Sequence, residues 1–189
     1  MPDELAASGT SKSSVSRRFV ARTSQQVGKY LSRPLDEIDL PAIVIDGTQM
    51  AKHLLVIAIG IDTDGHKHVL GVVEGSTESA AVGRALLRQL IERGLPVERA
   101  RLIVMDGSKG LRKAVRDTFG DWALIQRCRV HKLNNVLEHL PRHIRPWFAA
   151  KIRKAFKAGT NKQAGAKLLS VARELELAHP GAAASLREG

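Results

Sequence analysis

Two aspartates, each followed by glycine, stand where apolar runs of the sequence end. Asp46 follows Ile43–Ile45, and Asp106 follows Leu102–Met105. Apolar runs of this length between turn residues are typical of buried β-strands, and carboxylates at strand ends lie where α/β proteins bind ligands. Because Mg²⁺ is commonly held by one or two carboxylates together with phosphate oxygens, the pair favours metal-assisted phosphate chemistry. The alternative is that each Asp-Gly pair only makes a turn.

The elements around these aspartates predict one mixed sheet. Apolar runs over 53–61 and 69–73 flank an Asp-Thr-Asp-Gly turn, which predicts an antiparallel hairpin. A helix is predicted from Ser76 or Thr77 to Arg93. A right-handed crossover through this helix would place the second aspartate strand beside the first.

Beyond the second aspartate the pattern becomes helical. A helix over 108–116 and a short fifth strand over 123–126 are followed by three stretches with apolar residues at helical spacing. The first stretch contains Val130, Leu133, Val136, Leu137 and Leu140, the second contains Trp147, Phe148, Ile152 and Phe156, and the third runs over 167–177. We therefore predict an α/β fold followed by an all-α segment.

Charge is distributed unevenly along this basic chain, whose net charge is +11. Residues 1–30 carry five basic and two acidic side chains, residues 31–126 carry twelve and thirteen, and residues 127–189 carry thirteen and four. Basic flanks around a nearly neutral centre indicate an anionic partner such as nucleic acid, although a solvated basic surface is the alternative. The candidate DNA contacts are Lys12, Arg17, Arg18, Lys109, Arg129, Lys132, Lys151, Arg153, Lys154 and Lys157.

The N-terminal basic stretch predicts two helical pieces. The first begins among Ser and Thr residues that can cap a helix and has Val15 and Phe19 on one face. The second runs over 25–31 and ends at Arg33, because the residue before a proline disfavours the helical conformation. Two interpretations stay open, namely part of a helix-turn-helix and a lone basic helix.

A single cysteine, Cys128, excludes an internal disulfide and indicates a reducing compartment. No stretch approaches the ~18 apolar residues of a membrane span, and the N-terminus lacks a signal peptide's apolar core. We therefore predict a cytoplasmic, nucleoid-associated protein without a membrane partner. Cys128 and His131 have the spacing of half a zinc site, but no further ligands have matching spacing. We therefore expect no zinc, and instead a packed cysteine and a polar or DNA-contacting histidine.

The chain resembles the mutator-type transposases of bacterial insertion sequences. The resemblance is carried by Arg33-Pro34-Leu35, by residues 40–47 and 106–111, and most of all by residues 126–136 with 139–141. It implies a ribonuclease H-like catalytic fold with an Asp-Asp-Glu metal site. Asp46 matches the first catalytic aspartate and Asp106 the second.

The family's third carboxylate, a glutamate in an Asn-rich motif beyond a helical insertion, has no match in this sequence. The resemblance therefore implies a C-terminally truncated chain with three parts. Residues 1–30 would be the remnant of a DNA-binding region, 31–127 a catalytic core lacking its last helix, and 128–189 the start of the insertion. Glu138, on a predicted helix, is a candidate substitute, but the apolar stripe around it favours an ordinary amphipathic helix.

The implied activity is two-metal phosphoryl transfer with Mg²⁺, in which Asp46 bridges the ions and Asp106 holds one of them. Water would cut the transposon end, and the freed 3′-hydroxyl would attack target DNA. The implied partners are duplex DNA with terminal inverted repeats and target DNA, and a homo-oligomer stays open. We expect this chain to be inactive alone, and the alternative function is a non-catalytic, truncated DNA-binding inhibitor or remnant.

Overall fold

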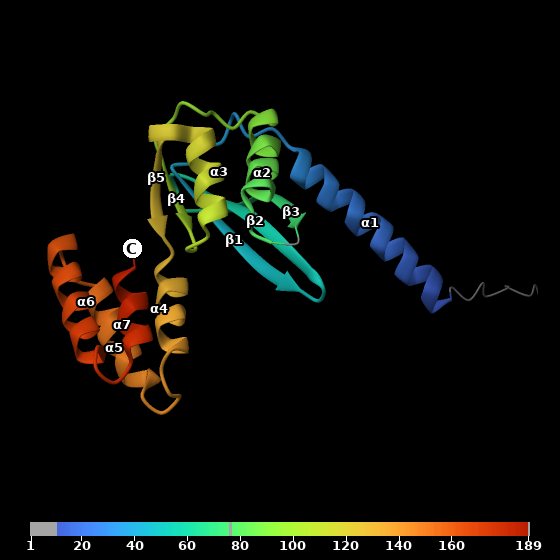
Figure 1. The fold of residues 1–189 in the computed structure, drawn as a ribbon. Helices are drawn as coiled ribbons and strands as arrows, with labels where there is room; N and C mark the ends of the chain where they lie inside the picture. Colours follow the sequence, from blue (N-terminus) through green and yellow to red (C-terminus); the bar gives the residue numbers. More distant parts are fainter. Residues whose placement is uncertain (1–10, 76, 189) are drawn as a thin grey trace, which may run out of the picture.

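The computed structural model describes residues 11–75 and 77–188 (Figure 1). Its first element, α1 (Lys12–Ser32), is one continuous helix that projects away from the sheet. The two predicted helical pieces are therefore a single helix, capped by Ser11 and ended before Pro34. Residues 12–32 contain no proline and a single glycine, Gly28, so the helix continues through its polar middle. The described part of α1 contains no turn of a helix-turn-helix.

A five-stranded mixed sheet forms the centre of the molecule. Its strands are β1 (Ala42–Met50), β2 (His53–Ile61), β3 (Lys67–Gly75), β4 (Arg101–Met105) and β5 (Ala123–Arg127), in the order β3-β2-β1-β4-β5. β1 and β2 pair antiparallel, as do β2 and β3, whereas β4 pairs parallel with β1 and with β5. The predicted hairpin and crossover are confirmed, and this order is that of a ribonuclease H-like fold.

The first strand is longer than predicted. β1 passes through Asp46, which pairs with Ile57, and continues to Met50 opposite His53. The chain turns only at Ala51 and Lys52, where Ala51 has φ 54°. The Asp-Gly pair at residues 46–47 is therefore not a turn, because the long apolar β2 extends the pairing past it.

Two helices cover one face of the sheet. α2 (Ala80–Glu92) and α3 (Lys109–Phe119) lie side by side (Figure 1), and a Cβ built on Gly83 of α2 would lie 2.8 Å from the Cβ of Ala114. Of the predicted caps of α2, Ser76 lies outside the described residues, and the observed cap is Ser79. The buried core beneath the two helices includes Ile43, Ile45, Val56, Leu70, Leu86, Leu87, Leu90, Ile103, Met105 and Leu111. On the opposite face, Leu102 and Leu124 are 40% and 63% exposed.

The C-terminal helices enclose a second core. After the short helix η1 (Gly120–Trp122) and β5 come α4 (Arg129–Glu138), α5 (Arg145–Phe156), α6 (Asn161–Leu175) and α7 (Pro180–Arg187). Their shared core contains Leu133, Val136, Leu140, Phe148, Ile152, Val171, Leu175 and Leu186. Four apolar residues of the predicted stretches are exceptions, since Val130 is 64%, Trp147 61%, Leu169 50% and Leu177 98% exposed. Among the residues that the structure describes, no helix is both long and apolar enough to cross a membrane.

Candidate active site

Asp46 and Asp106 lie at the same edge of the sheet, which is named the aspartate edge. Their strands are parallel neighbours in which Ile45 pairs with Met105, so the next residue on each strand is an aspartate. Asp106 makes a turn as well, because its Oδ1 accepts a hydrogen bond from the backbone N–H of Ser108 (2.8 Å). The two readings of the second Asp-Gly pair, turn and ligand site, are therefore compatible.

A third carboxyl group, that of Glu78, reaches the same place from the loop between β3 and α2. Burial, the neighbouring Asp106 charge, a hydrogen bond shared with Asp106 and the Asp46 charge together raise its pKa from 4.5 to about 7. A Cβ built on Gly47 would lie 2.7 Å from the Glu78 Cδ, so the carboxyl group lies against the bare backbone of β1. The sequence prediction did not include Glu78.

The start of α3 fixes the loop that carries Glu78. The Ser108 hydroxyl caps α3 at Leu111 and donates a hydrogen bond to the backbone carbonyl of Glu78 (3.0 Å). A Cβ on Gly110 would lie 2.5 Å from that same carbonyl oxygen, so only glycine permits this approach. The segment over 106–110 therefore both supplies Asp106 and docks the Glu78 loop.

The Cys-x2-His motif begins α4 directly after β5. Cys128 precedes the helix, and its backbone N–H donates to the Met105 carbonyl, which ties α4 to the aspartate edge. One turn later, His131 Nε2 lies 3.7 Å from Asp46 Oδ1, while His131 Nδ1 is buried without a hydrogen-bond partner among the described residues. The motif therefore places a histidine beside the first aspartate.

A cavity of about 520 Å³ opens beside Asp106. Its lining includes Ser108 with three basic residues, Lys109, Arg112 and Arg127. The Arg127 guanidinium lies against Gly107, where a Cβ would be 2.6 Å from Nη2, and its Nε is buried without a partner among the described residues. Glu188 also lines the cavity, and its backbone carbonyl accepts from Arg127 Nη1. Arg112 and Arg127 were absent from the predicted DNA contacts.

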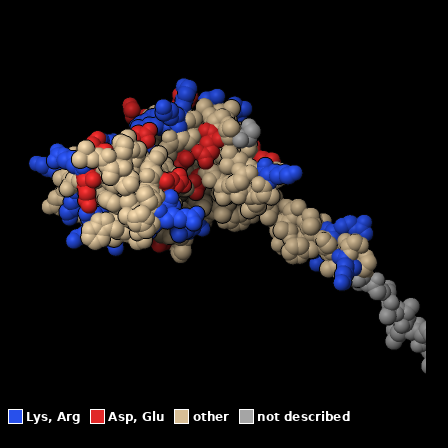
Figure 2. All heavy atoms as spheres, turned by 60° about the horizontal axis from the view of Figure 1, so that its bottom comes forward, with Lys and Arg blue, Asp and Glu red and all other residues tan. Residues whose placement is uncertain are grey.

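The predicted DNA contacts divide into exposed and engaged residues. Lys12, Arg17 and Arg18 on α1, and Arg153, Lys154 and Lys157 at the end of α5, are exposed. Figure 2 shows basic atoms near the outer end of α1 and others beside a group of acidic atoms near the middle of the face.

The engaged residues bind other parts of the chain. Arg129 donates to the Phe156 carbonyl (3.0 Å), and Lys151 pairs with Glu174 (2.6 Å). Lys132 is only 6% exposed, and its ammonium group donates to the carbonyl oxygens of Ser185 and Glu188. Lys132 therefore closes the end of α7 and is not available to a phosphate in this conformation.

Glu138 lies away from the aspartates. It is the last residue of α4, seven positions beyond His131, which at ~1.5 Å per residue corresponds to about two helical turns. Its exposed side chain lines a different cavity, together with His139 and Gly181. The structure does not bring this candidate substitute to the Asp46 site.

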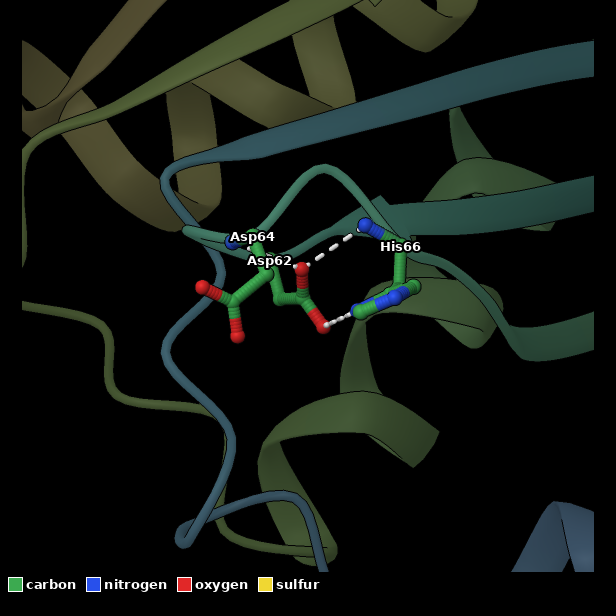
Figure 3. Close-up of side chains that lie close together, drawn as sticks. All are labelled: Asp62, Asp64 and His66. Atoms are coloured by element: carbon green, nitrogen blue, oxygen red, sulfur yellow. Dashed lines mark hydrogen bonds and ion pairs between the residues drawn. The ribbon is translucent and has the colours of Figure 1, made fainter.

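Another acidic group lies in the β2–β3 turn (Figure 3). Among the described residues, Asp62, Asp64 and His66 are the one group whose potential ligand atoms all lie within 4.8 Å of one another, and Asp46, Glu78 and Asp106 are spaced more widely. Asp62 Oδ1 accepts from the backbone N–H groups of Asp64 and His66, and Oδ2 binds His68 (2.7 Å), which lowers the pKa of Asp62. These hydrogen bonds close the hairpin turn, and they explain why the three side chains lie close together without a metal ion. His66 is exposed, whereas His68 is partly buried.

Comparisons with known proteins agree on one family. The profile of the family described as "Transposase, Mutator family" matches residues 1–189. The chain is 32% identical to the transposase of insertion sequence IS6120 from Mycolicibacterium smegmatis over 79% of this chain and 47% of the relative. It is 30% identical to the IS256 transposase in Tn4001 from Staphylococcus aureus, over 76% and 39%. The chain thus spans less than half the length of these curated relatives.

Among solved structures, the chain is similar to a viral intasome and to an integrase catalytic core domain. One is the simian T-cell lymphotropic virus intasome in complex with a PP2A regulatory subunit, with 13% identity, TM-score 0.35, and 73% of this chain and 49% of that chain covered. The other is the catalytic core domain of BIV integrase, with 12% identity, TM-score 0.33, and 77% of this chain and 80% of that chain covered. Scores this low support no conclusion about function.

Proposed function

The chain belongs to the Mutator family of transposases, and we propose that its Asp46–Asp106 edge is part of a Mg²⁺-dependent centre that cuts transposon-end DNA and joins it to target DNA. The observation that carries this proposal is that two aspartates directly follow a pair of residues on adjacent parallel strands, beside a cavity lined by Lys109, Arg112 and Arg127. A hard cation and a phosphodiester are the ligands that this combination suits.

The donor set fits a divalent magnesium ion. Asp46 and Asp106 offer carboxylate oxygens, the hard oxygen ligands that Mg²⁺ prefers. Asp46 is 45% exposed, so an ion can reach it from solvent. When bound, Mg²⁺ would stabilise negative charge on the attacking and leaving oxygens of a phosphodiester.

The chain's own residues would then position the DNA. Lys109 and Arg112 extend from the first turn of α3, whose N-terminus is itself favourable for a phosphate. Arg127 adds a positive charge to the lining of the same cavity, while its Nη1 donates to the Glu188 carbonyl. These groups would orient the scissile strand against Asp106, and the exposed basic residues on α1 and α5 would bind flanking duplex.

We also propose that this chain has little or no activity by itself. The family's third carboxylate has no counterpart at the position that the resemblance implies, and Glu138 faces another cavity. The second candidate function, a non-catalytic DNA-binding protein, is favoured by the basic residues of α1 and α5, which are exposed independently of the aspartate edge. In either function, the DNA partner that we propose is duplex DNA with the terminal inverted repeats, and the proposed assembly is a homo-oligomer.

The test is Mn²⁺ titration of the full chain, followed by the electron paramagnetic resonance signal of the free ion and by a nicking assay on duplex DNA. We expect Asp46→Asn and Asp106→Asn to weaken Mn²⁺ binding, and the exposed Asp121→Asn to leave it unchanged. Unchanged Mn²⁺ binding in both site variants would overturn the metal-dependent function. Nicking that disappears in Asp106→Asn identifies an enzyme, whereas DNA binding without nicking identifies the second candidate.

A further inference from the structure

Two parts of the fold, strand β1 and the start of α3, hold Glu78 in its position. Its backbone is fixed by the Ser108 hydroxyl and by the close approach of Gly110, and its carboxyl group lies against Gly47. The three contacts come from β1 and from the start of α3, the same two elements that carry or follow Asp46 and Asp106. The loop therefore delivers this side chain to the aspartate edge.

The Glu78 side chain is partly buried, with its carboxyl group against Gly47, the neighbour of Asp46, and its backbone is held by the segment that begins at Asp106. Ionised carboxyl groups that approach one place repel one another, and a divalent cation bound among them would attract all three. A glutamine would fill the same volume without supplying this charge.

We propose that Glu78 is a third carboxylate ligand of the metal centre, supplied by the β3–α2 loop. The inference rests on the proposed function of Asp46 and Asp106. It assigns to this chain an acidic residue other than the glutamate that the family resemblance places beyond the helical insertion. The side chain has three rotatable torsions, so its carboxylate can follow an ion while Ser108 and Gly110 hold the backbone.

His131 completes the surroundings of the proposed centre. Its Nε2 approaches Asp46 from the side of α4, at 3.7 Å from Oδ1. The imidazole and the Glu78 loop therefore reach the two aspartates from different elements of the fold.

The experiment is Mn²⁺ titration of the full chain and of Glu78→Gln, with the exposed Glu92→Gln as the matched control. We expect Glu78→Gln to weaken Mn²⁺ binding by about tenfold or more, the range seen when groups that support a metal site are removed. Glu92→Gln should bind like the wild type. Thermal unfolding without metal should show Glu78→Gln to be at least as stable as the wild type at neutral pH, which separates ligand loss from misfolding.

Glu78→Asp tests whether the loss of Mn²⁺ binding comes from the missing carboxylate or from a change in side-chain shape. This variant keeps the charge but has a shorter side chain. It should bind Mn²⁺ more tightly than Glu78→Gln, and equal losses in both variants would overturn the proposal. If Asp46→Asn and Asp106→Asn weaken binding but Glu78→Gln does not, Glu78 is not a ligand and the proposed function still stands. If none of the three changes Mn²⁺ binding, the proposed function itself fails.

Discussion

The carboxyl group of Glu78 lies on the backbone of Gly47, at the point where any other residue would place its Cβ. Gly47 is within a regular part of β1, opposite Val56, and its φ is not positive. The need for glycine at this position therefore comes from the approach of Glu78 and not from backbone conformation. A larger residue would displace the carboxyl group while the strand pairing remained.

Gly47→Ala should accordingly affect metal binding more than stability. The new Cβ would lie 2.7 Å from Glu78 Cδ, and the flexible side chain can move away from it. We expect Mn²⁺ affinity to fall while the free energy of unfolding changes by less than about 1 kcal/mol. Isothermal titration and urea unfolding measure the two quantities.

The control for this variant is Gly165→Ala in α6, where nothing lies within 4 Å of the new Cβ. It should keep Mn²⁺ affinity and gain about 0.5–1 kcal/mol, because alanine favours a helix over glycine. Wild-type Mn²⁺ affinity in Gly47→Ala would show that the Glu78 position does not matter for the ion.

The sheet and the aspartate pair were predictable because their signals are local. Apolar runs between turn residues mark the strands, and the handedness of crossovers places β4 beside β1. Glu78 was not predictable in this way. It lies in a loop without periodicity, and its partners Gly47 and Gly110 are distant in sequence and become neighbours only in the fold. The one indication in the sequence was that Ser108 and Gly110, two small residues at the start of a helix, leave room for another segment to approach.

Lys132 is the opposite case, because the local sequence pattern predicted a DNA contact and the prediction was wrong. On the helical pattern of α4 it belongs to the polar side, and its charge suggested a phosphate contact. The helix α7 packs against α4 and covers it, so the lysine binds the carbonyl groups that end α7. Helix ends need such partners, but which lysine supplies them depends on the tertiary fold.

Replacing Lys132 should therefore lower the free energy of unfolding in addition to removing a positive charge. Lys132→Met leaves the Ser185 and Glu188 carbonyl groups without their donor, and we expect a loss of about 1–3 kcal/mol. The exposed Lys154→Met should change stability by less than about 0.5 kcal/mol. Urea unfolding compares the two variants, and equal stability would mean that Lys132 is not a structural donor.

The pH dependence of stability should report on Glu78. Its pKa is raised from 4.5 to about 7 in the folded chain, so between these values the folded state binds more protons than the unfolded state. Its contribution to stability is therefore fully present below pH 4.5 and is lost as pH rises through about 7. In a chelating buffer, the stability of Glu78→Gln relative to the wild type should rise across this window and then level off. A difference that is independent of pH would show that the Glu78 pKa is ordinary.

DNA binding should depend on salt through the exposed basic residues of α5. Replacing Arg153, Lys154 and Lys157 by glutamine removes up to three phosphate contacts, each of which contributes about 0.9 to the slope of log affinity against log salt. Fluorescence anisotropy with a short duplex across a salt series measures this slope, which should become shallower in the variant. A matched control removes three exposed charges from the sheet and α2, namely Lys52, Lys67 and Arg88. If both triple variants lower the slope equally, DNA responds to the overall charge of the chain and α5 is not a specific part of its binding surface.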